Sequence, residues 1–261
     1  MATTIAISGK GGSGKTTLAA MIVRALRDRR GGAVLAVDAD PNSCLGLMMG
    51  VQPVSTVAEI REQARSKKPG ADTLGKGLDK LRSLEYGIQQ AVTEAEGFDL
   101  LTMGRPEGPN CYCAVNNFLR KFLDELSSAY AFVVVDNEAG MEHLSRRTTN
   151  NVDLLCIVAE PTPLGAITTK RIFELAKQLP IGVKRIGVIW NDKQNITDKM
   201  ADAKCEIDAV ESLGCVPYDK AVFDASMQSK TIFDIGQSSR AFSAMQEILE
   251  QRLNFKTTQI T

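Results

Sequence analysis

Short apolar segments alternate with longer amphipathic segments along most of the chain. The apolar segments are typical of strands buried on both faces, and the amphipathic ones repeat apolar residues at helical i, i+3, i+4 spacing. We expect strands at residues 5–7, 33–37, 98–103, 131–135, 154–159 and 185–190, and helices at 15–30, 54–65, from about 116, at 164–178 and at 241–253. This alternation predicts an α/β fold with a doubly wound, mainly parallel sheet and helices on both faces.

One stretch interrupts the alternation. Residues 66–97 begin with polar, turn-forming residues and continue with a weak helical pattern from Leu74 to Val92. We expect a helical or loop insertion there, within a single domain spanning residues 1–261. Two roles stay open for it, a mobile segment that meets a partner and a solvated excursion.

Composition narrows the classes of partner. The chain has 31 basic and 31 acidic residues, which gives no support for binding nucleic acid or an anionic membrane. No apolar run approaches the roughly 20 residues that cross a bilayer. Because the first strand begins almost at residue 1, we expect no signal peptide, a cytoplasmic location and six reduced cysteines.

Residues 9–17 read Gly-Lys-Gly-Gly-Ser-Gly-Lys-Thr-Thr, between a strand and a helix. This spacing is typical of a phosphate-binding loop, whose glycines let several backbone N–H groups face one anion at a helix N-terminus. Lys15 would reach the β- and γ-phosphates, and the Thr16 hydroxyl suits Mg²⁺. The nucleotide-binding residues predicted here are Gly11, Gly12, Ser13, Gly14, Lys15, Thr16 and Thr17. A glycine-rich turn without a ligand is the alternative.

Lys10 is an addition that a plain phosphate loop does not need. With it, the motif resembles the deviant Walker A motif of the MinD/ParA/nitrogenase iron-protein group of dimeric ATPases. That resemblance implies a nucleotide-dependent homodimer in which Lys10 crosses to the partner subunit's nucleotide. The alternative is a solvated lysine on a loop.

Carboxylates follow two of the predicted central strands. Asp38 and Asp40 follow one strand, and the pair resembles the switch I segment of the same group, with Asp38 in or behind the Mg²⁺ shell and Asp40 orienting the attacking water. Asp136 follows another strand and fits a Walker B aspartate that holds Mg²⁺ through water, while Gly140 offers its N–H to the γ-phosphate. An Asx turn and an ordinary strand-end aspartate are the respective alternatives.

Asn191, after the strand at 185–190, is placed to bind adenine through its amide, which carries both a donor and an acceptor. A guanine site would have Lys at position 192 and Asp at position 194, where this chain has Asp192 and Gln194. The sequence therefore favours ATP over GTP. The loop around Pro217 is predicted to cradle the base from a second side.

Cys111 and Cys113 form a Cys-x-Cys pair, which cannot complete a tetrahedral site alone. Two facing copies of the chain would supply four sulfurs, a ligand set that suits Ni²⁺, Zn²⁺ or an iron–sulfur cluster. Packed or capping thiols are the alternative. The single histidine, His143, is more typical of a surface position than of a ligand, and Cys44 more typical of a small packed side chain.

The full motif set resembles the nickel-insertion ATPases that mature carbon monoxide dehydrogenase and acetyl-CoA synthase, the CooC/AcsF group. The resemblance spans nearly the whole chain and rests on the segments 10–17, 38–46, 111–113 and 136–144. It implies a cytoplasmic ATPase with a client nickel enzyme and a metal shared between subunits. Three alternatives remain: a positioning ATPase without metal, an electron-transfer ATPase with a bridging [4Fe–4S] cluster, and a scaffold that binds nucleotide without hydrolysis.

Overall fold

The structure, a computed structural model, describes residues 2–66, 86–105, 125–126, 128–139, 151–178, 182–196, 207 and 210–252. Within these residues an eight-stranded sheet runs in the order β10-β9-β7-β1-β5-β2-β4-β3. All neighbouring pairs are parallel except β3 and β4. The strands are β1 (Thr3–Gly9), β2 (Val34–Ala39), β3 (Thr93–Ala95), β4 (Phe98–Thr102), β5 (Phe132–Asn137), β7 (Leu154–Ala159), β9 (Ile186–Asn191) and β10 (Glu211–Val216).

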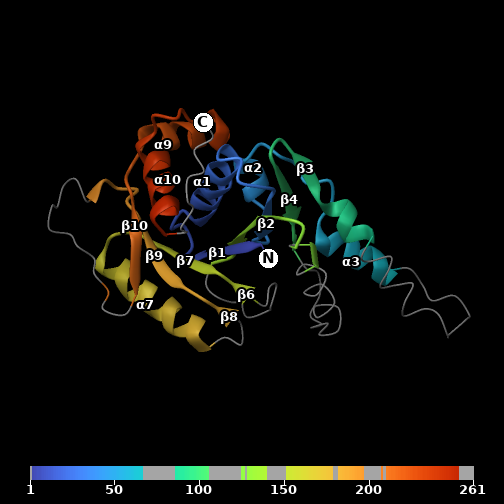
Figure 1. Cartoon of the computed structure of the whole chain (residues 1–261), viewed down its shortest axis with the longest axis horizontal. Coiled ribbons are helices and arrows are strands. Elements are labelled where there is room, and N and C mark those ends of the chain that lie inside the picture. Colours follow the sequence, from blue (N-terminus) through green and yellow to red (C-terminus); the bar gives the residue numbers. More distant parts are fainter. Residues whose placement is uncertain are drawn as a thin grey trace, which may run out of the picture.

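Helices lie on both faces of this sheet (Figure 1). One core contains the inward side chains of α1 (Lys15–Asp28), α10 (Arg240–Arg252) and α2 (Leu45–Met48), and the other contains those of α3 (Val57–Ser66) and α7 (Pro163–Gln178). The short elements α9 (Lys220–Met227) and η1 (Ile232–Asp234) join β10 to α10, and β6 (Asn151–Val152) pairs with β8 (Gly182–Val183). The predicted doubly wound, mainly parallel α/β fold is confirmed.

Most predicted boundaries agree with the structure to within two or three residues, but three details differ. The strands β2, β5 and β9 run further than expected, so that Asp38, Asp136 and Asn191 lie inside strands rather than after them. Residues 93–97, assigned to the insertion, contain β3 and its tight turn into β4, where Gly97 has φ +82°. The short helix α2 was not expected. Much of the insertion and of the helix from about residue 116 lies outside the described residues.

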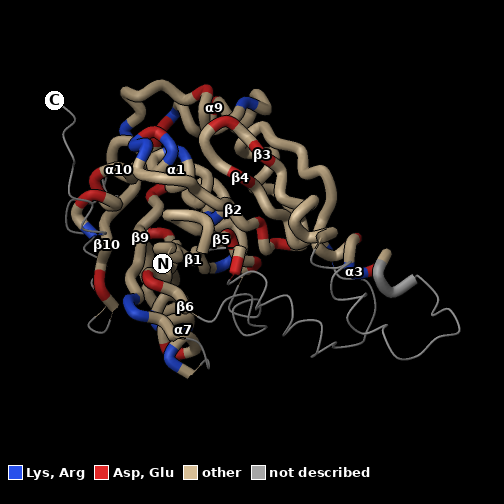
Figure 2. Tube along the Cα trace, turned by 45° about the vertical axis from the view of Figure 1, so that its right-hand side comes forward, with Lys and Arg blue, Asp and Glu red and all other residues tan. Residues whose placement is uncertain are grey.

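Charged residues of both signs are interspersed along the described chain (Figure 2). Among the helices described, none is long and apolar enough to cross a membrane.

Phe242 of α10 ties α10 to α1 and η1. Its side chain has no exposed surface, and the Arg24 guanidinium carbon lies 3.9 Å from the centre of its ring. Arg24 is 3% exposed and donates from Nη1 to the Ile232 carbonyl at 2.7 Å. A buried aromatic ring thus supports a buried cation whose hydrogen bond fixes the segment before α10.

We expect Phe242→Ala to lower the free energy of unfolding by about 3–5 kcal/mol, because it leaves a cavity and removes the ring beneath Arg24. Urea unfolding followed by circular dichroism measures this loss. The matched control is Phe223→Ala on α9, whose side chain is 53% exposed and whose removal should cost less than about 1 kcal/mol. Equal losses in the two variants would contradict the assignment.

Candidate functional site

The carboxyl ends of the central parallel strands meet at one edge of the sheet, and the candidate residues gather there. Gly9 ends β1, Asp38 and Asp136 lie near the ends of β2 and β5, and Asn191 ends β9. Glu160 follows β7 directly. This is the edge at which open α/β sheets bind ligands.

The phosphate loop joins β1 to α1 with a tight, glycine-dependent curve. Gly14 has φ +95°, and a Cβ atom there would lie 2.2 Å from Nδ2 of Asn191. A side chain at position 14 is therefore excluded both by backbone conformation and by its neighbour. Inside the loop, Ser13 N donates to the Lys10 carbonyl at 3.1 Å, and Lys15 Nζ donates to the same carbonyl at 3.3 Å.

Two carbonyls of the loop accept hydrogen bonds from the last residue of β9 and from the segment that follows it. Asn191 Nδ2 donates to the Ser13 carbonyl at 2.8 Å, and Lys193 Nζ donates to the Gly12 carbonyl at 2.6 Å. Asn191 thus lies beside the loop, as its predicted role requires, with one amide hydrogen already used. Its Oδ1 atom and second hydrogen remain the groups suited to a base.

Asp38 and Asp136 are register partners on the adjacent strands β2 and β5, and neither has exposed surface. Asp38 accepts from the backbone N–H groups of Leu45 at 2.8 Å and Asp40 at 3.2 Å. Neither oxygen of Asp136 has a hydrogen bond of full geometry. Two buried carboxylates side by side, one unpartnered, form a region of strong negative potential next to the phosphate loop.

The pKa of both carboxyls reflects this burial. Burial raises the pKa of Asp38 to about 6 against the opposing effect of the Leu45 and Asp40 N–H groups. Burial also raises the pKa of Asp136 to about 7, while the nearby Thr16 hydroxyl and the Lys15 charge act to lower it. A bound cation would favour the ionised forms of both groups.

Asp40 lies on the exposed side of this pair. Its Oδ1 atom accepts from the Asn42 backbone N–H at 2.8 Å and from Asn42 Nδ2 at 2.9 Å, which closes an Asx turn. Cys44 in the same segment is exposed, and its Sγ donates to the Asn42 carbonyl at 3.5 Å. Burial, followed by the charges of Asp38, Asp40 and Asp136, raises the pKa of the Cys44 thiol.

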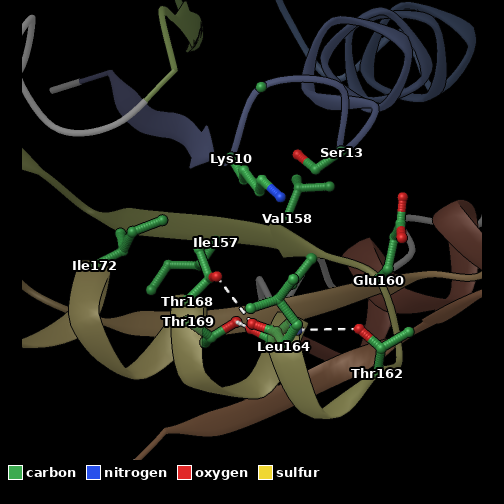
Figure 3. Close-up of a pocket in the computed structure, with 13 residues that line it drawn as sticks. Lys10, Ser13, Ile157, Val158, Glu160, Thr162, Leu164, Thr168, Thr169 and Ile172 are labelled. Atoms are coloured by element: carbon green, nitrogen blue, oxygen red, sulfur yellow. Dashed lines mark hydrogen bonds between the residues drawn. The ribbon is translucent and has the colours of Figure 1, made fainter.

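A pocket of about 90 Å³ lies between the phosphate loop, the end of β7 and the start of α7. Lys10 and Ser13 point toward it from the loop, and Leu164, Thr168 and Thr169 line it from α7 (Figure 3). The start of α7 is capped, because Thr162 Oγ1 accepts from Gly165 N at 3.0 Å. Lys10 thus lies at the junction of the loop with α7.

The predicted base loop around Pro217 is fixed by Asp219. Its Oδ1 atom accepts from Ala221 N at 2.8 Å, which caps α9. Its Oδ2 atom accepts from Ser239 Oγ at 2.7 Å and from Ala241 N at 3.2 Å, which holds the start of α10. One carboxylate therefore anchors the loop to both helices.

Four of the residues singled out lie outside the described residues: Gly140, His143, Cys111 and Cys113. In the ranges that are described, no cluster of three or more His, Cys, Asp or Glu side chains is arranged to hold a metal ion.

Sequence reasoning missed three polar residues at this edge. Glu160 Oε1 lies 2.7 Å from Lys193 Nζ, and the buried Asn137 donates from Nδ2 to the Ile7 carbonyl at 2.9 Å. Glu160 could have been identified from the sequence, because it directly follows an apolar strand. Lys193 and Asn137 could not, because the residues they contact are distant in sequence.

We expect Asp136→Asn to raise the stability of the nucleotide-free protein at pH 8 by on the order of 2–4 kcal/mol. With its pKa raised to about 7, against 3.8 ordinarily, the folded wild type binds a proton more tightly than the unfolded chain does. Its free energy of unfolding therefore falls as pH rises from about 4 to about 7. Urea unfolding at pH 5 and pH 8 without Mg²⁺ measures the difference.

Asp153→Asn is the control for that experiment. Burial acts to raise the pKa of Asp153, but Lys184 and the Thr4 N–H lower it below its ordinary value. Loss of this carboxylate should therefore destabilise the protein at pH 8. A stabilising change in Asp153→Asn, or none in Asp136→Asn, would contradict the electrostatic picture.

Residues 4–232 match the family described as the CobQ/CobB/MinD/ParA nucleotide binding domain. An uncharacterized ATP-binding protein of Methanocaldococcus jannaschii is 38% identical, with 97% of this chain and 99% of that protein covered. The carbon monoxide dehydrogenase accessory protein CooC of Rhodospirillum rubrum is 32% identical, with 95% of this chain and 96% of that protein covered.

Among solved structures, the septum site-determining protein MinD of Pyrococcus horikoshii, complexed with Mg-ADP, superposes with a TM-score of 0.69. It is 22% identical, and all of both chains is covered. At 22% identity this similarity shows the fold alone. The match of residues 4–232 shows the family to which the chain belongs. The chain belongs to the CobQ/CobB/MinD/ParA nucleotide-binding family and is a P-loop ATPase.

Proposed function

We propose that the protein is a Mg-ATP-dependent, dimerising ATPase that acts as an accessory protein in the maturation of a nickel enzyme of the carbon monoxide dehydrogenase/acetyl-CoA synthase class. The observation that carries the proposal is the 32% identity to the carbon monoxide dehydrogenase accessory protein over 95% of this chain. The Cys-x-Cys pair at 111 and 113 supports it, because two thiolates per chain suit a soft metal shared by two copies.

The residues at the sheet edge fit a magnesium ion. Asp136 presents two buried oxygens without hydrogen-bond partners, and Asp38 is its register partner on the next strand. The Thr16 hydroxyl is close enough to influence the Asp136 carboxyl. Oxygen donors of this kind are the ligands that Mg²⁺ prefers, and the ion would neutralise charge on the β- and γ-phosphates. We assign Thr16 to the ion directly, Asp136 through water, and Asp38 in or behind the same shell.

The remaining roles follow the geometry of the loop. Backbone N–H groups of residues 11–17 other than Ser13, whose N–H donates to the Lys10 carbonyl, bind the phosphates. Lys15, only 7% exposed, moves from the Lys10 carbonyl to the phosphate oxygens. Asp40 orients the attacking water through the carboxylate oxygen that its Asx turn leaves available. Gly140 donates its N–H to the γ-phosphate, and Asn191 and the Pro217 loop bind adenine.

Lys10 is the residue that couples nucleotide binding to dimerisation. It is exposed and is one of the residues that line the pocket beside α7. When two copies meet across this edge, Lys10 of one chain neutralises phosphate charge bound to the other. Nucleotide binding and dimer closure then depend on each other, and hydrolysis changes the geometry of the metal thiolates and the client surface.

A positioning ATPase without metal cargo is the second candidate. It is favoured by the 30% identity, over 69% of this chain, to the maintenance of carboxysome distribution protein A of Synechococcus elongatus. Metal content of the purified protein separates the two candidates.

We expect Lys10→Gln to bind nucleotide as a monomer with affinity near wild type but to lose ATP-driven dimerisation. The two phosphate groups would then face each other without their crossing cation. Sedimentation with and without ATP measures the dimer fraction, and Lys177→Gln, on the exposed end of α7, is the matched control. An unchanged dimer fraction in Lys10→Gln would leave Lys10 as a solvated side chain.

We expect the wild-type protein to bind one Ni²⁺ or Zn²⁺ per two chains through four sulfurs, with release of protons and a shift toward dimer. Changing both Cys111 and Cys113 to Ser should abolish this binding and leave ATP binding near wild type. Metal titration with X-ray absorption measures stoichiometry and ligand type, and Cys215→Ser, at an exposed cysteine, is the control.

Client maturation is the readout of the cellular role. A strain that carries only the double cysteine variant should accumulate a nickel-poor client enzyme. A stoichiometry of one ion per chain, or a coordination shell of nitrogen and oxygen ligands, would contradict the proposed metal site shared by two chains. Neither result would affect the assignment as an ATPase.

A further inference from the structure

Lys193 joins three parts of the site at a single ammonium group. Its Nζ donates to the Gly12 carbonyl at 2.6 Å and lies 2.7 Å from Glu160 Oε1. Gly12 belongs to the phosphate loop, Glu160 to the turn between β7 and α7, and Lys193 to the segment after β9. An ammonium has three hydrogens in a compact head, so it can satisfy a carbonyl and a carboxylate together.

The direction of the Gly12 carbonyl matters for anion binding. In a phosphate loop the N–H groups that bind the anion point inward, which turns the carbonyls of their own peptides outward, where each needs a donor. The Ser13 carbonyl shares its peptide with the Gly14 N–H, while the Gly12 carbonyl shares its peptide with the Ser13 N–H, which closes the turn by donating to the Lys10 carbonyl at 3.1 Å. Asn191 donates a hydrogen bond to the Ser13 carbonyl, and Lys193 donates one to the Gly12 carbonyl. The stem of Lys193 also passes over the loop, since a Cβ atom on Gly14 would lie 4.0 Å from its Cδ.

The segment that carries Lys193 is itself held in place. Asp192 has no exposed surface, and its Oδ1 accepts from Ile196 N at 2.7 Å. The Asp192 backbone N–H donates to the Val216 carbonyl at 2.9 Å. Lys193 therefore extends from a hydrogen-bonded turn next to the Pro217 loop, and its side chain is 40% exposed.

The backbone of Glu160 is also held in place. Its carbonyl accepts from Thr162 N at 2.7 Å, and a Cβ atom on Gly165 would come within 2.0 Å of the same oxygen. The backbone of Glu160 thus lies where α7 meets the sheet, and the side chain that extends from it is 32% exposed. Pairing with Glu160 restricts the rotamers of Lys193 and keeps its ammonium group on the loop.

We infer that Lys193 is a positioning residue for nucleotide binding, anchored by Glu160. The pair, here named the Glu160–Lys193 clamp, holds the phosphate loop in its anion-binding shape before nucleotide arrives. The inference rests on the nucleotide binding of the family and not on the nickel-enzyme role, so the absence of a metal or a client leaves it intact.

The test compares full-length wild type, Lys193→Met, Glu160→Gln and the double variant. Affinity is measured for ADP with Mg²⁺ and, by competition against a fluorescent ADP analogue, for inorganic tripolyphosphate, which has no base. Lys184→Met is the matched control, because Lys184 forms a similar ion pair with Asp153 at 2.6 Å near the opposite ends of the strands. Thermal unfolding without ligand reports the integrity of each variant.

We expect Lys193→Met to weaken ADP and tripolyphosphate by a similar factor of about ten, since a charge-assisted bond that shapes the loop is lost. Glu160→Gln should weaken both about threefold, and the double variant should resemble Lys193→Met because the two residues act as one unit. Lys184→Met should match wild type in both affinities, and the ligand-free unfolding temperatures of Lys193→Met, Glu160→Gln and the double variant should stay close to that of wild type.

Wild-type affinities in Lys193→Met would overturn the inference. Loss of ADP affinity with unchanged tripolyphosphate affinity would also overturn it, because Lys193 would then contact only the base side. Strictly additive losses of affinity in the double variant would contradict the inference that Lys193 and Glu160 act as one unit. If Lys193→Met does not fold, Glu160→Gln alone decides between a threefold loss and none.

Discussion

The outward turn of the phosphate-loop carbonyls is the constraint on which the rest of the site depends. N–H groups can converge on an anion only when the carbonyls of the same peptides face away and find donors there. In this fold the donors come from the end of β9, which lies two strands from β1 with β7 between them. Close approach of Asn191 leaves no space for a side chain at Gly14. Anion binding by the loop therefore depends both on the glycines of the loop and on the strand order that brings β9 close to it.

The buried carboxylates impose a second requirement on the same sheet. Parallel pairing of β2 with β5 places Asp38 directly beside Asp136, so the register that aligns the apolar residues also brings two acids together. Without a cation this arrangement opposes ionisation, as the raised pKa values of both carboxyls express. The fold thus maintains an unfavourable pair whose charge a magnesium nucleotide would balance, which ties the stability of the site to its ligand.

The sequence correctly predicted the features that are determined by residues close together in the chain. Apolar runs identified the central strands, and the glycine–lysine spacing located the phosphate loop, because both are determined by residues near one another. The strand β3 is only three residues long, and α2 only four, so neither has enough length for periodicity to appear. The Glu160–Lys193 contact joins segments brought together by sheet order alone, and no spacing rule reports such a pair. The sequence predicts the loop around Pro217, but the contacts of Asp219 with the starts of both α9 and α10 could be found only in the structure.

The nucleotide site cannot select a cargo by itself. Its loop, carboxylates and strand order belong to a fold that also superposes on MinD and ParA-family ATPases, and a shared fold does not determine a shared client. In the proposed function, discrimination comes from residues outside the phosphate-binding site, and the thiols of Cys111 and Cys113 suit a soft metal. Two thiols per chain complete a tetrahedral metal shell only when two chains meet, and the proposed crossing of Lys10 makes that meeting depend on ATP. Metal capture and nucleotide binding would then be coupled through assembly, without direct contact between the two sites.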